Sequence, residues 1–121
     1  MTKYAAIQQF WESFDIPAYA AESVPTDAEF PYITYNIVEG GDYSTPTLMS
    51  ANVWYRETGW VNAGQKVISI RRALSSMRPI AVDEGYLRLW RGSPYAQRQS
   101  DPDDDMVKRY YLNVYAKYYE K

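Results

Sequence analysis

The chain of 121 residues contains no cysteine and no histidine. Without cysteine there can be no disulfide scaffold, no thiol nucleophile and no Cys/His zinc site. Without histidine, the side chain best suited to proton transfer near neutral pH is missing, so catalysis would depend on other side chains alone. We find no catalytic constellation among those, and these absences predict that the protein is not an enzyme.

Basic charge and long apolar runs are also scarce. The chain has 13 Lys and Arg against 15 Asp and Glu, which gives a formal net charge of −2. General nucleic-acid binders normally carry a basic excess. No apolar run approaches the ~18 residues of a membrane span, and the N-terminal residues hold no signal-peptide core. We expect a protein of a cytoplasm-like compartment, without a membrane partner.

Aromatic residues are abundant instead. Thirteen Tyr, four Trp and three Phe make 17% of the chain. Tyrosine buries a large area and keeps a polar hydroxyl, so it suits a surface that alternates between water and a partner. The length predicts one compact domain over residues 1–121.

Two segments carry apolar residues at helical spacing. The first starts near Thr2, a candidate N-cap, and ends before Pro17. The second covers Asn62–Arg78, with Asn62 as its N-cap, and is closed by Pro79. Their apolar positions are Tyr4, Ile7, Trp11 and Phe14 in the first and Val67, Ile70, Leu74 and Met77 in the second.

Four segments alternate apolar and polar residues, or are bracketed by turn residues, as strands do. The segment Pro17–Pro31 is predicted as a long connection in which Tyr19 anchors a short edge strand. The polar segment Ser93–Asp105 is predicted as a mobile loop. The predicted strands are Phe30–Val38, Thr47–Glu57, Gly85–Gly92 and Met106–Tyr119.

The order of these elements is α-β-β-α-β-β. Short links between consecutive strands favour an α+β fold, with an antiparallel four-stranded sheet and helices packed on one face. The last strand would span about 46 Å if straight, whereas a domain of this size is about 35 Å across. It must therefore bend, bulge, or project toward a neighbouring molecule.

An acidic cluster precedes the last strand. Asp101, Asp103 and Asp105 match alternate ligand positions of a calcium loop, but Met106 stands where the turn needs Gly and Leu112 where a Glu ligand belongs. We interpret the cluster, which includes Asp104, as a solvated loop that docks on a basic patch of a partner. No metal or cofactor is predicted.

Arginine and aromatic residues interleave just before this loop. Arg91 and Arg98, with Arg88, Trp90 and Tyr95, fit either nucleic-acid stacking or a protein interface. The element order differs from that of an RNA-recognition sheet, so the interface interpretation is favoured.

The last strand presents one polar and aromatic face. This face is explained either by a half-solvated sheet surface or by contact with another subunit. The candidate interface residues are Arg91, Tyr95, Arg98, Asp101, Asp103, Asp104, Asp105, Arg109, Tyr111 and Tyr115.

Several stretches form an ordered series along nearly the whole chain. They are Phe30-Pro31-Tyr32-Ile33-Thr34-Tyr35, Val53-Trp54, Leu89-Trp90-Arg91-Gly92-Ser93-Pro94-Tyr95-Ala96-Gln97 and Asp103-Asp104-Asp105-Met106-Val107-Lys108-Arg109-Tyr110. The series resembles the tail terminator, or tail-completion, proteins of long-tailed bacteriophages, a head-tail joining group also called minor capsid proteins.

The resemblance implies a structural protein of the virion, made in the bacterial cytoplasm and placed at the junction of tail and head. Such subunits form a hexameric ring that caps the tail-tube protein and meets a neck or stopper protein, and they can stay monomeric before assembly. DNA passes through the ring only as cargo. The loops Gly40–Pro46 and Ser93–Asp105 are then expected to contact tube or neck proteins.

Two alternatives stay open. One is another neck component, such as a stopper or head-closure protein. The other is a binding module unrelated to phages, or a small metal-dependent hydrolase that uses the acidic loop.

Overall fold

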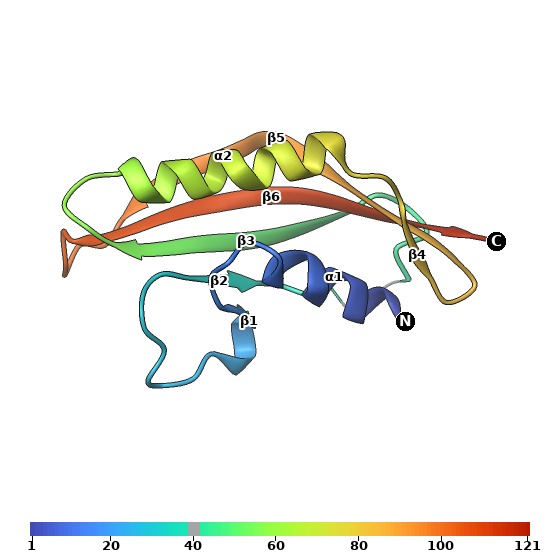
Figure 1. Cartoon of the computed structure of the whole chain (residues 1–121), viewed down its shortest axis with the longest axis horizontal. Helices are drawn as coiled ribbons and strands as arrows, with labels where there is room; N and C mark the ends of the chain where they lie inside the picture. The colour runs from blue at the N-terminus through green and yellow to red at the C-terminus, as the bar shows by residue number, and fades with distance from the viewer. Residues whose placement is uncertain (39–41) are drawn as a thin grey trace.

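Six strands form one curved sheet in the computed structural model, which describes residues 1–38 and 42–121 (Figure 1). The strand order is β1-β2-β3-β6-β5-β4. The strands are Ala18–Ala20 (β1), Tyr32–Tyr35 (β2), Thr47–Arg56 (β3), Ile80–Val82 (β4), Gly85–Ser100 (β5) and Val107–Glu120 (β6). The helices are Lys3–Glu12 (α1) and Val61–Ser76 (α2), with a short 3-10 turn at Ala21–Ser23 (η1).

The predicted fold class, an antiparallel four-stranded sheet in the order α-β-β-α-β-β, is wrong. The sheet has six strands and is mixed, because β1 runs parallel to β2 while every other neighbouring pair is antiparallel. The two added strands, β1 and β4, have three residues each and lie at the two edges. Three residues are too few for alternation to show clearly in a sequence. Only Tyr19 in β1 was anticipated.

The predicted loop Ser93–Asp105 is also wrong over most of its length, since β5 continues to Ser100. Pro94 and the polar composition hide the strand. Arg91 pairs with Val114 but Ala96 pairs with Leu112, so a bulge in β5 accommodates the extra residues. Proline is tolerated at such a point because no ladder N–H is needed there. The Nδ2 of Asn113 donates a hydrogen bond to the carbonyl of Pro94 at 2.9 Å.

Strand β6 is central and does not project toward another molecule for pairing. It pairs with β3 over Val107–Ala116 and with β5 over Lys108–Glu120, apart from the bulge. It curves along its length together with these neighbours (Figure 1). Long partners and curvature thus accommodate its fourteen residues within the fold.

Strand β4 covers only a short part of β5. It pairs with Gly85–Leu87. From Arg88 to Ser100, no strand in the described part of the chain pairs with the other edge of β5. The bulge and Pro94 lie on this open edge.

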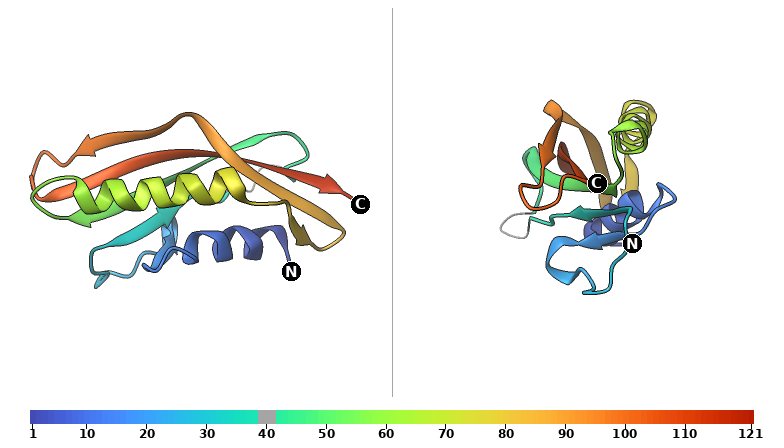
Figure 2. Two further views of the ribbon diagram at one scale, coloured as in Figure 1. Left: turned by 45° about the horizontal axis from the view of Figure 1, so that its top comes forward. Right: turned by 90° about the vertical axis from the view of Figure 1, so that its left-hand side faces the viewer.

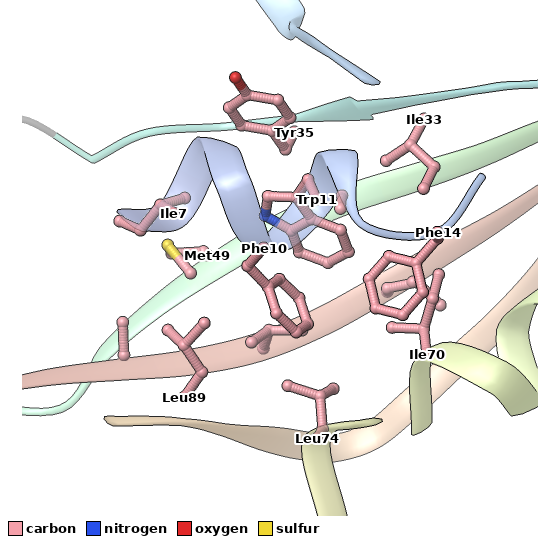
Figure 3. Packing of buried hydrophobic residues seen from close by; sticks show 14 of the residues in the cluster. Ile7, Phe10, Trp11, Phe14, Ile33, Tyr35, Met49, Ile70, Leu74 and Leu89 are labelled. Atoms are coloured by element: carbon pink, nitrogen blue, oxygen red, sulfur yellow. The ribbon is translucent and has the colours of Figure 1, made fainter. Parts of the chain in front are cut away.

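Both helices cover the same face of the sheet and enclose the hydrophobic core (Figure 3). Trp11 of α1 is fully buried and stacks on Tyr35 of β2, with ring centroids 6.4 Å apart. Ile70 and Leu74 of α2 close the other side of the core. Most of the apolar helix positions found in the sequence are buried, whereas Tyr4 is exposed; the buried ones are Ile7, Trp11, Phe14, Val67, Ile70 and Leu74.

Of the two N-cap residues predicted from the sequence, Thr2 is confirmed and Asn62 is wrong. The Oγ1 of Thr2 accepts the Ala5 N–H at 3.1 Å, as the N-cap prediction requires. Helix α2 instead begins before Asn62, and the Glu57 carboxylate accepts the N–H groups of Asn62 and Ala63 at 3.2 and 2.9 Å. A carboxylate at a helix N-terminus stabilises the unpaired N–H groups and the helix dipole.

Candidate interaction surface

One face of the sheet is left uncovered by the helices, and we call it the outer face. It carries the alternate residues of each strand that point away from the core, as the strand register requires. Arg109, Tyr111 and Tyr115 of β6 lie here and are partly exposed. Its members are Tyr19, Tyr32, Thr34, Leu48, Ser50, Asn52, Trp54, Arg56, Ala81, Tyr86, Arg88, Trp90, Gln97, Gln99, Val107, Arg109, Tyr111, Asn113, Tyr115, Lys117 and Tyr119.

Aromatic rings stack across neighbouring strands of this face. Trp90 stacks on Tyr115 with ring centroids 5.6 Å apart, and Tyr32 stacks on Trp54 at 6.1 Å. The indole Nε1 of Trp54 donates to the Thr34 Oγ1 at 2.9 Å. Cross-strand aromatic pairs hold one another in fixed orientations. The face is therefore a preorganised set of flat, partly exposed rings.

Two guanidinium groups cover these rings, and neither forms an ion pair with a carboxylate in the described part of the chain. The Arg109 guanidinium lies 5.2 Å from the Trp54 ring centre, and that of Arg88 lies 4.7 Å from Trp90. Arg109 also donates to the side-chain oxygens of Asn52 and Gln99. Among the described members of the outer face there are four Lys or Arg and no carboxylate. Of these four cations, Arg56 forms an ion pair with Asp104, at 3.4 Å.

The candidate interface residues are not brought into one patch. Arg109, Tyr111 and Tyr115 lie together on the outer face, whereas Arg91 and Arg98 point to the helix-covered side, because they pair with Val114 and Tyr110 of the core. The Arg98 Nε donates to the Tyr110 hydroxyl at 2.8 Å. Its guanidinium also lies 5.0 Å from the ring centre of Trp60.

Tyr95 joins β5 to helix α2. Its hydroxyl donates to the carbonyl of Val67 at 2.9 Å. Burial raises the pKa of this hydroxyl well above its ordinary value, while the nearby guanidinium groups of Arg71 and Arg91 act in the opposite direction. Tyr95 is thus a structural contact with a polar end, next to exposed arginines.

The four aspartates form the tip of the β5–β6 hairpin. Asp101 Oδ1 accepts the Asp103 N–H at 2.8 Å, and Asp104 Oδ1 accepts the Met106 N–H at 2.9 Å. These carboxylates cap their own turns, as aspartates in tight loops commonly do. Within residues 1–38 and 42–121, no three acidic side chains gather in a geometry that would hold a metal ion. Asp101, Trp54 and Arg109 are among the residues that line a hollow of about 250 Å³.

The predicted contact loop Gly40–Pro46 is described only in part, since residues 39–41 lie outside the described residues. Tyr43 is buried, and its backbone carbonyl accepts the Tyr118 N–H at 2.7 Å. The Tyr43 hydroxyl accepts the Val38 N–H at 3.1 Å. This part of the loop is thus fixed to the core.

Sequence reasoning missed Trp54 and Trp90 as members of one surface with Tyr115. Alternation along a strand shows which residues of that strand share a side. It does not show that β3 and β5 both pair with β6, which is what brings these three residues onto one surface. No helix in the described part of the chain is long and apolar enough to cross a membrane.

Comparisons with known proteins show a likeness of fold. No protein-family model matches the chain, and no curated protein matches its sequence. Its structure is similar to a chain of a solved structure described as the virion of a native gene transfer agent particle, with a TM-score of 0.72. The likeness covers 97% of this chain and 94% of that chain at 17% sequence identity. The two chains share a fold over nearly their whole lengths.

Proposed function

We propose that the chain is a structural assembly subunit of a phage-like virion. The observation that carries this proposal is the fold likeness to a virion chain, which extends over 97% of this chain. The match covers nearly the whole length of both chains, so the similarity is not confined to a shared part of two otherwise different folds. The outer face, with its partly exposed stacked rings and the guanidinium groups that cover them, gives such a subunit a surface suited to protein contacts.

Within the virion we propose the role of a tail terminator. Copies of the chain form a hexameric ring that caps the last layer of tail-tube protein and joins the tail to the neck below the head. The ordered motif series supports this specific role, and the role needs no catalytic step. In this proposal the outer face and the acidic hairpin tip contact the tube and neck proteins, and DNA passes the ring as cargo.

The test uses the genome that encodes the chain. The gene is deleted, particle production is induced, and the products are examined by electron microscopy. We expect unjoined heads and tails, with tails of irregular length because nothing stops tube growth. A plasmid copy of the gene should restore joined particles. Joined particles without the gene would contradict the virion role.

The same images separate the terminator role from other neck roles. Unjoined tails of uniform length would assign the chain to another neck component, such as a stopper. Gold-labelled antibody against the chain adds a second measurement. Label at the head-proximal end of free tails supports the terminator, and label on free heads supports the stopper.

A further inference from the structure

Charge is strongly segregated along this chain. From Tyr4 to Tyr55 the sequence holds seven Asp and Glu and no Lys or Arg. Twelve of the thirteen Lys and Arg lie from Arg56 onward. The overall charge of −2 therefore conceals an acidic first part and a basic second part.

The fold gathers part of the acidic half into one surface, residues 12–29, which we call the acidic segment. It includes the end of α1, strand β1, the η1 turn and the connection toward β2. The carboxylates of Glu12 and Glu22 both lie close enough to Tyr35 to add to the effect of burial in raising the pKa of its hydroxyl. Glu22, Asp27 and Glu29 are exposed, and none has an ion-pair or hydrogen-bond partner among the described residues.

The fold also gathers basic residues in a groove between α2 and β5. Leu74 and Ser75 of the helix and Arg88, Trp90 and Arg91 of the strand line this hollow. Arg71 is a neighbour of the groove lining, because it lies on α2 one helical turn before Ser75. We call this the α2–β5 groove.

The groove has no internal counter-charge. None of its arginines forms an ion pair with a carboxylate in the described part of the chain. Trp90 supplies flat apolar area beside the guanidinium groups, and the Arg88 guanidinium lies 4.7 Å from its ring centre. Arginine with Trp and Tyr is the combination that most often dominates protein interfaces.

The two surfaces lie on opposite sides of the molecule. Helix α2 and strand β5 lie at the top in Figure 1, and β1 with the following turn lies at the bottom; the right-hand view of Figure 2 separates them in the same way. They cannot neutralise each other within one copy. Complementary patches on opposite sides allow head-to-tail contact, which closes into a ring when the rotation between copies fits.

We infer that the acidic segment of one copy docks in the α2–β5 groove of a second copy. That this contact builds a ring rests on the proposed function. The contact itself depends only on the two surfaces of the chain. Opposite potentials speed and orient such docking. The contact weakens as salt rises, because exposed charges are screened over about 10 Å at 0.1 M salt.

Charge reversal tests the contact. Sedimentation velocity over a concentration series at low and high salt measures association of the unmodified chain. We expect salt-sensitive association that weakens more than tenfold in Arg71→Glu/Arg91→Glu and in Asp27→Lys/Glu29→Lys. Equimolar mixing of the two variants, or combining all four substitutions in one chain, should restore association.

The control is Lys117→Glu/Lys121→Glu, which changes the net charge as much as Arg71→Glu/Arg91→Glu does. It should associate like the unmodified chain. Circular dichroism and thermal unfolding should give equal results for all variants, since the altered side chains are on the surface. Equal loss in the control, or no rescue on mixing, would overturn the inference.

The absence of cysteine permits an independent test. Two variants, Glu29→Cys and Arg91→Cys, each carry a single thiol, because the unmodified chain has no cysteine. Under mild oxidation the mixture should yield a disulfide-linked dimer in several-fold excess over either variant alone. Equal yields in all three samples would show that the two surfaces do not meet.

The remaining outcomes separate this inference from its rivals. A chain that stays monomeric throughout overturns the contact but leaves the virion role to the particle experiment. Conversely, salt-sensitive association in a chain absent from particles would keep the contact and remove the virion role. Binding of a single-stranded oligonucleotide that is lost in Arg71→Glu/Arg91→Glu, without self-association, would assign the groove to nucleic acid instead.

Discussion

The ring of Trp90 stacks on the ring of Tyr115 across strands β5 and β6, with the two planes 22° apart. Both residues remain partly exposed on the outer face. Such a pair stabilises the fold by about 0.5–1.5 kcal/mol beyond its buried area. The exposed remainder of both rings is apolar area that a partner protein can still bury.

Replacing Tyr111 and Tyr115 together by Ser should separate stability from assembly. Loss of the stack and of cross-strand contacts should lower the free energy of unfolding by about 1–3 kcal/mol. Joined particles should fall to the level of the gene deletion, counted by electron microscopy. Tyr4→Ser is the matched control, because Tyr4 is exposed and its helix α1 packs on the side of the sheet opposite the outer face. Normal joining in the double variant would remove the outer face from the proposed function.

The hairpin tip can be neutralised without removing β5. Asp103 and Asp105 are exposed, and their carboxylates accept no described hydrogen bond. Asp103→Ser/Asp105→Ser should therefore change the free energy of unfolding by less than about 0.5 kcal/mol. Tail joining should nevertheless decrease if the tip docks on a basic partner.

Deletion of residues 93–105 is expected to have a different result. It removes the part of β5 that pairs with Lys108–Leu112, so the chain should lose its cooperative unfolding transition. A deletion variant that unfolds cooperatively, measured by thermal denaturation, would contradict the described strand.

The contact between Tyr95 and α2 predicts a defined loss of stability. Tyr95→Phe removes the hydroxyl that donates to the Val67 carbonyl. The free energy of unfolding in urea should fall by about 1 kcal/mol. Tyr86→Phe, which alters an exposed ring, should have no measurable effect. Equal effects of the two substitutions would show that the Tyr95 hydroxyl has no special role.

Alkaline pH should destabilise the protein partly through the same residue. The raised pKa of folded Tyr95 means that its hydroxyl keeps a proton that the unfolded chain releases above about pH 10. Its contribution is fully present below that pH and is lost as the pH rises, by up to about 1.4 kcal/mol per pH unit. Urea unfolding between about pH 9 and 11 should show a shallower decline in Tyr95→Phe. Parallel declines would contradict this assignment.

The bulge in β5 should depend on Gly92. A Cβ at this position would lie 2.8 Å from the Asn113 Cβ, closer than side chains tolerate. Gly92→Ala should therefore lower the free energy of unfolding by about 1–3 kcal/mol. Gly59→Ala is the control, because a Cβ there meets no atom within 4 Å. Thermal denaturation of both variants measures the difference, and equal melting temperatures would contradict a tight fit at Gly92.

Much of the fold follows from local sequence pattern. The bounds of β3 and β6 were predicted to within one residue at each end, because alternation over ten or more residues is a strong signal. The end of β5 was missed because its signal is local and weak, while the strand is held by a partner far along the chain. Alternation is interrupted at Pro94, and only pairing with β6 restores the register at Ala96.

The candidate site was predictable in composition but not in arrangement. Arg109, Tyr111 and Tyr115 were placed correctly on one face by alternation. Arg91 and Tyr95 were grouped with them by proximity in sequence, although they belong to the helix-covered side. Which residues share a face depends on bulges and on the pairing of distant strands, and neither is visible in a short window of sequence.

The open edge of β5 has a consequence for unassembled copies. Exposed strand edges recruit other edges and lead to fibres. Here Pro94 offers no N–H, and the bulge breaks the regular ladder where an incoming strand would have to align. Edge-to-edge pairing of two copies through this part of β5 is therefore disfavoured, and a contact between copies would have to be made by side chains.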